Sequence, residues 1–185
     1  MLSYLGIDAV ISDDLNTLKS ADRLILPGVG HFAHGINQLN NLGFTDVIKE
    51  HALTQQKPIL GICLGMQLMT NFSEEGDVEG LGLIDAQTKQ FKLQDKSLKI
   101  PHMGWNEVSW QKESPILNSL SEKPRYYFVH SYFVECKHQN DVLGTTHYGQ
   151  DFVSAFQHDN IIGMQFHPEK SHQFGMELLK NFTKL

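Results

Sequence analysis

The sequence lacks long apolar runs and an excess of positive charge. No stretch of about 18 apolar residues occurs, and the first ten residues lack the basic start and apolar core of a signal peptide. With 15 Lys and Arg against 21 Asp and Glu, the formal charge is −6. Binding to nucleic acid or to an anionic membrane needs a basic face instead. We therefore expect a cytoplasmic protein with neither of these partners.

Cysteine is scarce, and histidine forms no cluster. Cys63 and Cys136 are far apart and form no Cys-x-x-Cys pair, which is typical of a reducing compartment without disulfides. The ten histidines are scattered, and the nearest pair, His31 and His34, has no carboxylate or thiolate beside it. We predict no metal site and no cofactor. Because no Pro- or Ser-rich linker divides the chain, we also predict a single domain over residues 1–185.

The sequence does contain short apolar runs that alternate with helix-compatible segments. The runs "AVI" (9–11), "RLILPGVG" (23–30) and "KPILGIC" (57–63) precede the helix-compatible stretches 13–22, 32–56 and 64–72. Wholly apolar strands indicate a parallel sheet covered on both faces. Later segments are rich in aromatic and β-branched residues, which favours antiparallel strands, before a last helix that begins at Ser171. The prediction is an α/β three-layer sandwich with a mostly parallel central sheet and antiparallel strands in the C-terminal half.

The segment "GICLGMQ" (61–67) makes Cys63 a candidate nucleophile. Gly-x-Cys-x-Gly at the end of a buried strand has the form of a nucleophile elbow, with cysteine in place of serine. This turn would place Cys63 at a helix N-terminus, which favours the thiolate. The alternative is a small buried residue at a strand end, because buried cysteine is common.

The segment "QFHPEKS" (165–171) offers a base for that nucleophile. In an extended segment residues i and i+2 point to the same side, so His167 can face Cys63 while Glu169 orients its imidazole. The alternative is a surface turn. Both motifs follow apolar strands, however, and strand ends are where open α/β sheets place their sites.

An oxyanion needs hydrogen-bond donors, and two are available. The amide of Leu64 directly follows the nucleophile, and "PGVG" (27–30) follows another apolar strand. By itself, "PGVG" is typical of an ordinary turn.

With "PGVG", "GICLGMQ" and "QFHPEKS" in this order, the chain resembles the class I glutamine amidotransferases, whose triad is Cys-His-Glu. The segments "PHMGWNEV" (101–108) and "YFVHSYF" (127–133) make it most similar to the glutaminase subunits of imidazole glycerol phosphate synthases. The resemblance implies a flavodoxin-like fold that hydrolyses L-glutamine to glutamate and ammonia. It further implies a heterodimer with a (βα)8 cyclase subunit, which receives the ammonia through a tunnel. The cyclase would make imidazole glycerol phosphate and aminoimidazole carboxamide ribotide in histidine biosynthesis.

The resemblance also assigns roles to individual positions. The positions are Cys63, His167 and Glu169 for the triad; the amides of Val29 and Leu64 for the oxyanion hole; Gly30, Gln67, Glu75, Ser131 and Tyr132 for glutamine; and Trp105, Tyr127, His130 and Lys170 at or near the subunit interface. Glu75 suits the substrate ammonium, although its segment "SEEGDVEG" (73–80) is otherwise typical of a solvated loop. Exposed aromatic side chains suit an interface, although core packing is the alternative.

The resemblance implies two further features. Related chains begin with an apolar strand, a glycine-rich turn and a helix that leads into "YLG" (4–6), so this first strand is missing here and a central sheet edge is left open. The Gly28–Val29 peptide is expected to rotate when the partner binds its ligand, because glycine tolerates unusual backbone angles.

Three alternatives remain at this point. Paralogues of these subunits supply ammonia for amidino sugars of surface polysaccharides, and the tail "SHQFGMELLKNF" (171–182) is somewhat similar to theirs. The chain is otherwise a stand-alone peptidase or γ-glutamyl hydrolase on a similar scaffold, or a truncated, inactive binding module.

Overall fold

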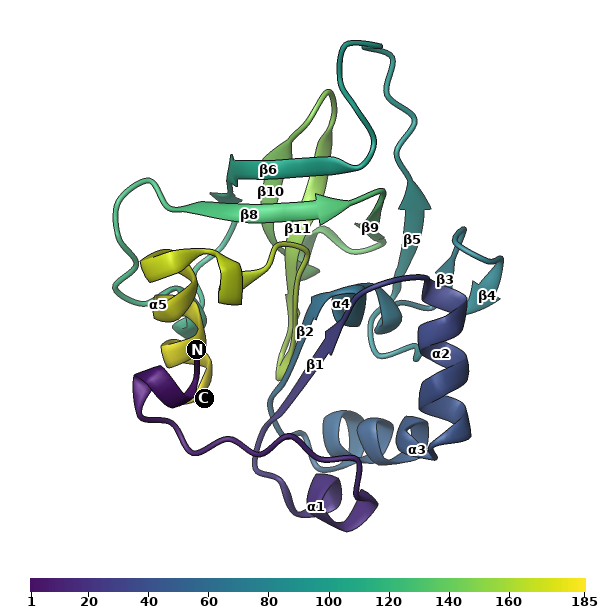
Figure 1. Cartoon of the computed structure of the whole chain (residues 1–185), viewed down its shortest axis with the longest axis vertical. Coiled ribbons are helices and arrows are strands. Elements are labelled where there is room, and N and C mark those ends of the chain that lie inside the picture. Colours follow the sequence, from purple (N-terminus) through teal and green to yellow (C-terminus); the bar gives the residue numbers. More distant parts are fainter.

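The computed structural model describes all residues, 1–185, as a ten-stranded sheet with helices on both faces and a separate strand pair (Figure 1). The strands of the large sheet are β1 (Leu24–Gly28), β2 (Ile59–Cys63), β3 (Phe72–Ser73), β4 (Val78–Glu79), β5 (Ala86–Gln90), β7 (Ser109–Trp110), β9 (Tyr132–Cys136), β10 (Val142–His147), β11 (Asp151–His158) and β12 (Ile161–Met164). The separate pair is β6 (His102–Glu107) and β8 (Arg125–His130). The helices are α1 (Leu15–Ser20), α2 (Phe32–Asn41), α3 (Phe44–Lys49), α4 (Leu64–Leu68) and α5 (His172–Phe182).

The large sheet mixes parallel and antiparallel pairing. Its main path runs β1-β2-β12-β11-β9-β5-β3-β4, and β10 pairs with β11 and β7. The pairs β1–β2, β2–β12 and β3–β5 are parallel, and the others are antiparallel. The predicted α/β class and the antiparallel strands of the C-terminal half are confirmed. Parallel pairing is confined to fewer strands than the apolar runs indicated.

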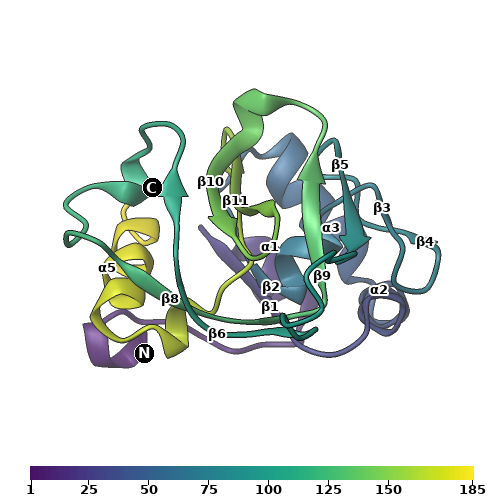
Figure 2. The same cartoon turned by 90° about the horizontal axis from the view of Figure 1, so that it is seen from above.

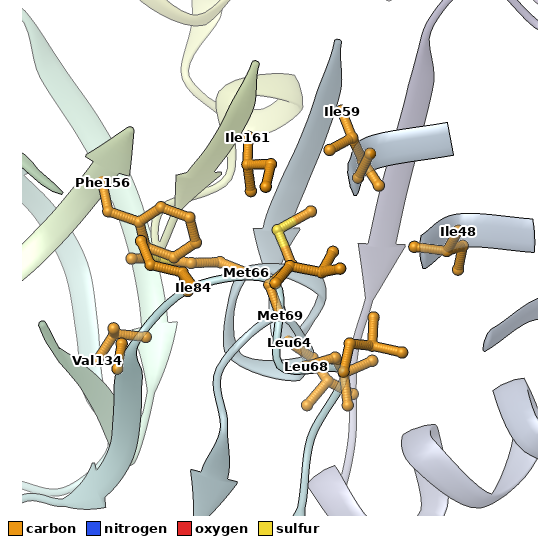
Figure 3. Packing of buried hydrophobic residues seen from close by; sticks show 14 of the residues in the cluster. Ile48, Ile59, Leu64, Met66, Leu68, Met69, Ile84, Val134, Phe156 and Ile161 are labelled. Carbon is orange, nitrogen blue, oxygen red and sulfur yellow. The ribbon is translucent and has the colours of Figure 1, made fainter. Parts of the chain in front are cut away.

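Alternating side chains of the central strands enter two apolar cores. Ile59 and Ile161 face the core beneath α2, α3 and α4, where Met66 is fully buried (Figure 3). Leu60 and Ile162 face the opposite core, which α5 covers. Each fully buried side chain of this size contributes about 1.5–3 kcal/mol. Burial on both faces explains why the sequence of β2 is apolar throughout.

Two local predictions are wrong. The run at 9–11 forms no strand: Val10 is 76% and Ile11 104% exposed, because no strand lies beside them to pair with and no core covers them. β1 is therefore the edge strand of the sheet. The helix-compatible stretch 32–56 is divided after α2, where Gly43 adopts the left-handed φ of 72°.

The last helix begins after Ser171, as predicted, but the Ser171 hydroxyl does not cap it. That hydroxyl donates to the carbonyl of His167 (2.6 Å) and accepts from the amide of Tyr127 (3.0 Å). Leu178 and Phe182 are buried on the face toward the sheet. α5 therefore packs as expected, while the residue before it fastens β8 to the segment that follows β12.

The pair β6–β8 crosses one end of the large sheet, between α5 and β9 (Figures 1 and 2). Cys63 at the end of β2 has its Sγ 3.9 Å from the carbonyl oxygen of Val129 in β8. The backbone of β8 thus covers the end of β2. None of the helices is both long and apolar enough to span a membrane.

Candidate active site

Cys63 occupies a strained turn between β2 and α4. Its backbone has φ 55° and ψ −112°, a conformation that costs on the order of 1–3 kcal/mol for a non-glycine residue. The flanking glycines are required sterically. A Cβ at Gly61 would lie 2.7 Å from the amide nitrogen of Met66, and one at Gly65 would lie 1.7 Å from the carbonyl oxygen of Leu26. The structure therefore has the nucleophile-elbow geometry that the sequence predicted.

Gly65→Ala is expected to lower the free energy of unfolding by about 3 kcal/mol or more, because its methyl group meets rigid backbone. Gly35→Ala in α2 is the matched control, since its methyl group would contact only the flexible tips of Leu64 and Leu68 and alanine favours helix. We expect the control to change stability by no more than about 1 kcal/mol. Urea unfolding of both variants measures the difference, and equal effects would contradict the close approach at Gly65.

His167 connects Cys63 to Glu169. The Nδ1–H of His167 donates to Oε1 of Glu169 over 2.7 Å. Its Nε2 is buried without a hydrogen-bond partner, and His167 and Cys63 line the same cavity. The structure thus brings the three predicted triad residues together, with His167 hydrogen-bonded to Glu169 and beside Cys63 at the cavity.

The surroundings favour the charged form of His167. Burial by itself lowers the pKa of His167, but its neighbours Cys63 and Glu169 together raise it by more, to about 9. Burial likewise tends to raise the pKa of Glu169, yet the hydrogen bond from His167 holds it below its ordinary value. An imidazole that readily takes a proton is what a thiol nucleophile requires beside it.

The backbone of His167 is fixed by β8. Its amide donates to the carbonyl of Tyr127 over 2.8 Å, and its own carbonyl accepts from Ser171. Because Ser171 also accepts from the Tyr127 amide, both the amide and the carbonyl of Tyr127 are hydrogen-bonded to the segment 167–171.

Cys63 opens into a cavity of about 410 Å³, a size common for small-molecule sites. Its lining residues are Val29, Gly30, Cys63, Leu64, Gln67, Glu75, Pro101, Val129, His130, Ser131, Tyr132, His167 and Lys170. Every residue predicted for the oxyanion hole and for glutamine binding is among them, together with Cys63 and His167. Glu169 lies behind His167 and does not line the cavity. No group of three or more His, Cys, Asp or Glu side chains is placed to hold a metal ion.

Two of the predicted glutamine contacts already have partners. Gln67 is buried, and its amide donates to the carbonyl of Tyr132 (3.0 Å) and to Oε1 of Gln165 (2.9 Å). Glu75 accepts through Oε2 from the amide of Phe32, the first residue of α2, over 2.7 Å. The segment 73–80 is thus anchored through Glu75, which lines the cavity, and is not merely a solvated loop.

The two candidate oxyanion donors differ in their surroundings. Leu64 is the first residue of α4 and is buried, and the first amides of a helix have no partner within it. Val29 has its side chain 77% exposed, and Gly30 follows with φ 102°. One donor position is therefore rigid, and the other lies on an exposed, glycine-flanked loop.

The four residues predicted at or near a subunit interface occupy two different environments. Trp105 is 38% exposed, stacks on His172 at 5.3 Å and meets Tyr127 edge-on at 6.2 Å. Lys170 places its Nζ 5.8 Å from the centre of the Tyr127 ring. His130 is instead buried, with an exposure of 6%, and lines the cavity. Only Trp105, Tyr127 and Lys170 lie where a partner can touch them directly.

Sequence reasoning missed Gln165. This residue is fully buried, accepts from Gln67, and has its Nε2 3.9 Å from Sγ of Cys63. It lies two residues before His167, so the alternation that linked His167 to Glu169 also points to Gln165.

A family model described as glutamine amidotransferase class-I matches residues 5–185. The chain belongs to the class I glutamine amidotransferases. It is 50% identical to the imidazole glycerol phosphate synthase subunit HisH 2 of Methanococcus maripaludis, over all of this chain and 91% of that protein. It is 48% identical to the protein of the same name from Pseudomonas aeruginosa, with the same coverage. The resemblance inferred from the motifs is confirmed at the level of the family.

Solved structures agree on the amidotransferase fold. A putative GMP synthase protein from Thermoplasma acidophilum is similar with a TM-score of 0.72 at 22% identity, covering 99% of this chain and 83% of the other. Another glutamine amidotransferase gives a TM-score of 0.75 at 16% identity, covering 98% of this chain and 90% of the other. At these identities the likeness concerns the fold alone.

Proposed function

We propose that this chain hydrolyses L-glutamine to glutamate and ammonia, as the glutaminase subunit of an imidazole glycerol phosphate synthase. The observation that most strongly supports this proposal is that Cys63, His167 and Glu169 lie next to one another in that order. Cys63 and His167 line a cavity that every predicted substrate-binding residue also lines. Family membership supports the reaction class, and the names of the relatives support the pathway.

The chemistry follows from the positions of these groups. Nε2 of His167 holds the proton of the Cys63–His167 pair, and Sγ of Cys63 attacks the amide carbon of glutamine while the amides of Val29 and Leu64 hold the oxyanion. His167 then protonates the leaving nitrogen, which departs as ammonia and leaves a γ-glutamyl thioester on Cys63. Water, deprotonated by His167, attacks the thioester and releases glutamate. Glu169 stabilises the imidazolium at both stages.

Glutamine recognition is assigned to the far end of the cavity. Glu75 would pair with the substrate ammonium through the oxygen that does not bind Phe32, and the backbone near Ser131 and Tyr132 would face the carboxylate. A hydrogen bond to a charged group contributes about 1.5–3 kcal/mol.

Glu75→Gln is therefore expected to raise the KM for glutamine roughly 10- to 100-fold with a smaller change in kcat. The amide oxygen of the substituted side chain can still accept from the amide of Phe32, so the hydrogen bond that anchors segment 73–80 is kept. Glu74→Gln is the matched control, because this substitution removes the same charge. Glu74 lies outside the cavity, where its side chain accepts from the amide of Gln90. Steady-state kinetics of both variants test the assignment. Equal KM values for glutamine would contradict it.

The ammonia is proposed to pass to a (βα)8 cyclase subunit that docks over β6 and β8. Ammonia released into neutral water is mostly protonated and non-nucleophilic, so a dry transfer keeps it reactive. Trp105, Tyr127 and Lys170 form an aromatic and cationic surface beside the catalytic segment, and aromatic side chains are typical interface anchors.

The experiment for the whole proposal measures glutamate release by the chain alone, with the cyclase, and with the cyclase and its ligand. We expect release to rise with the cyclase and again with its ligand. Activity indifferent to both favours a stand-alone γ-glutamyl hydrolase. Activation by an amidino-sugar enzyme in place of the cyclase favours the polysaccharide pathway. A thiol that never reacts with a glutamine analogue identifies an inactive binding module.

A further inference from the structure

We propose that His102 is a positioning residue for glutamine, acting through His130 on the carbonyl of Tyr132. The inference rests on the proposed function, since it assigns a support for the same cavity. His102 lies in "PHMGWNEV" and does not itself line the cavity. In the antiparallel pair β6–β8, His102 stands directly opposite His130.

The two imidazoles form a buried row that ends at the substrate cavity. Nδ1 of His102 is 3.1 Å from Nε2 of His130, and Nδ1 of His130 is 2.7 Å from the carbonyl oxygen of Tyr132. The rings are 3% and 6% exposed. His102 is also stacked between Tyr148 (4.1 Å) and Phe128 (4.9 Å), so its ring is held on both faces.

The positions of the protons follow from both ends of this row. A carbonyl only accepts, so Nδ1 of His130 must donate to Tyr132, and Nε2 of a neutral His130 must then accept from His102. At the other end, the Asn106 amide is oriented because its oxygen accepts from the Glu107 amide (2.8 Å) and its nitrogen donates to the carbonyl of His147 (3.0 Å). That nitrogen lies 3.3 Å from Nε2 of His102, which must therefore accept.

Both ends thus require the same arrangement, with two neutral imidazoles that each carry their proton on Nδ1. Burial supports neutrality, lowering the pKa of His102 to about 4. Burial is also the main cause that lowers the pKa of His130 to about 3, against the hydrogen bond to Tyr132. The row is fully satisfied and points in one direction, from Asn106 to Tyr132.

The two histidines position the carbonyl group of Tyr132, which is the last acceptor in this chain of hydrogen bonds. The Tyr132 carbonyl receives two donors, His130 and Gln67, and both of these residues line the cavity together with Ser131 and Tyr132. Without the donor on His102, Nε2 of His130 would be buried and unsatisfied, which costs more than the hydrogen bond itself contributes. We expect His130 to rotate, releasing the Tyr132 carbonyl and loosening the wall that faces the glutamine carboxylate.

The test compares His102→Phe, which keeps a stacked ring but has no donor, with His102→Asn, whose amide can donate near the position of Nδ1. The chain of residues 1–185 is alkylated at Cys63 either by a chloroketone analogue of L-glutamine or by chloroacetamide, which lacks the amino-acid end. His102→Phe is expected to slow the chloroketone about 5- to 10-fold and leave chloroacetamide unchanged, and His102→Asn to restore the chloroketone rate to within about 2-fold.

Unchanged chloroketone labelling of His102→Phe would overturn the inference. An equal slowing of both reagents would also overturn it, because it indicates a structural role only. Failure of the proposed function looks different, since the unsubstituted chain would then react with chloroacetamide but show no preference for the chloroketone.

Discussion

Cys63→Ala is expected to abolish glutamine-dependent synthesis by the complex with the cyclase, lowering its rate at least ~10⁴-fold. The cyclase's reaction with added ammonium salt should remain unchanged. In the proposed mechanism Sγ of Cys63 forms the thioester. Alanine removes this atom but leaves the backbone of β8 over the end of β2, and the outer surface of β6 and β8, unaffected. Product formation from each nitrogen source measures both effects.

Cys136→Ala is the matched control for this result. Cys136 lies in β9, does not line the cavity, and burial raises its pKa to about 12. We expect its replacement to leave glutamine-dependent synthesis within about 2-fold, because this half-buried thiol with a raised pKa lies outside the cavity and takes no part in the proposed chemistry. Loss of activity in the control but not in Cys63→Ala would show that the nucleophile is the other cysteine.

Glu169→Gln is expected to lower glutaminase activity about 10²- to 10⁴-fold, comparable to the loss of the orienting carboxylate in other triads. The amide keeps the shape of the side chain but removes the negative charge beside His167. The pKa of His167, raised to about 9 in the folded chain, should therefore fall. An NMR titration of the His167 ring measures that pKa, and an unchanged value would contradict the hydrogen bond to Glu169.

The same shift predicts how stability depends on pH. The pKa of His167 is higher in the folded chain than its ordinary value of 6.5. Its contribution to stability is therefore fully present below pH 6.5 and is lost as the pH rises through about 9. The difference in free energy of unfolding between the unsubstituted chain and Glu169→Gln should be larger at about pH 6 than at about pH 9.5. Urea unfolding at the two pH values checks the sign.

The fold was predictable where local pattern and tertiary packing agree. β2 is apolar throughout because both of its faces are covered, so its sequence indicates its place. "AVI" carries the same local signal, but Val10 and Ile11 remain exposed because no strand lies beside them. An apolar run specifies a tendency to be buried, and only the rest of the chain determines whether a partner is present.

The geometry of the candidate site was predictable where its residues are close in sequence. The spacing of Gly61, Cys63 and Gly65 determines the sharp turn, and the alternation of His167 and Glu169 determines their common direction. The contact between His102 and His130 depends on the register of β6 against β8, which no local pattern encodes. The Glu75 contact with Phe32 likewise joins residues 43 positions apart.

The most direct measurement of the central claim intercepts the thioester on Cys63 with hydroxylamine during turnover of L-glutamine by the complex. If Cys63, His167 and Glu169 act as described, γ-glutamyl hydroxamate forms at the expense of glutamate, and none forms with Cys63→Ala. Hydroxamate from the Cys63→Ala complex, or steady glutamate release that hydroxylamine never diverts, would contradict the account.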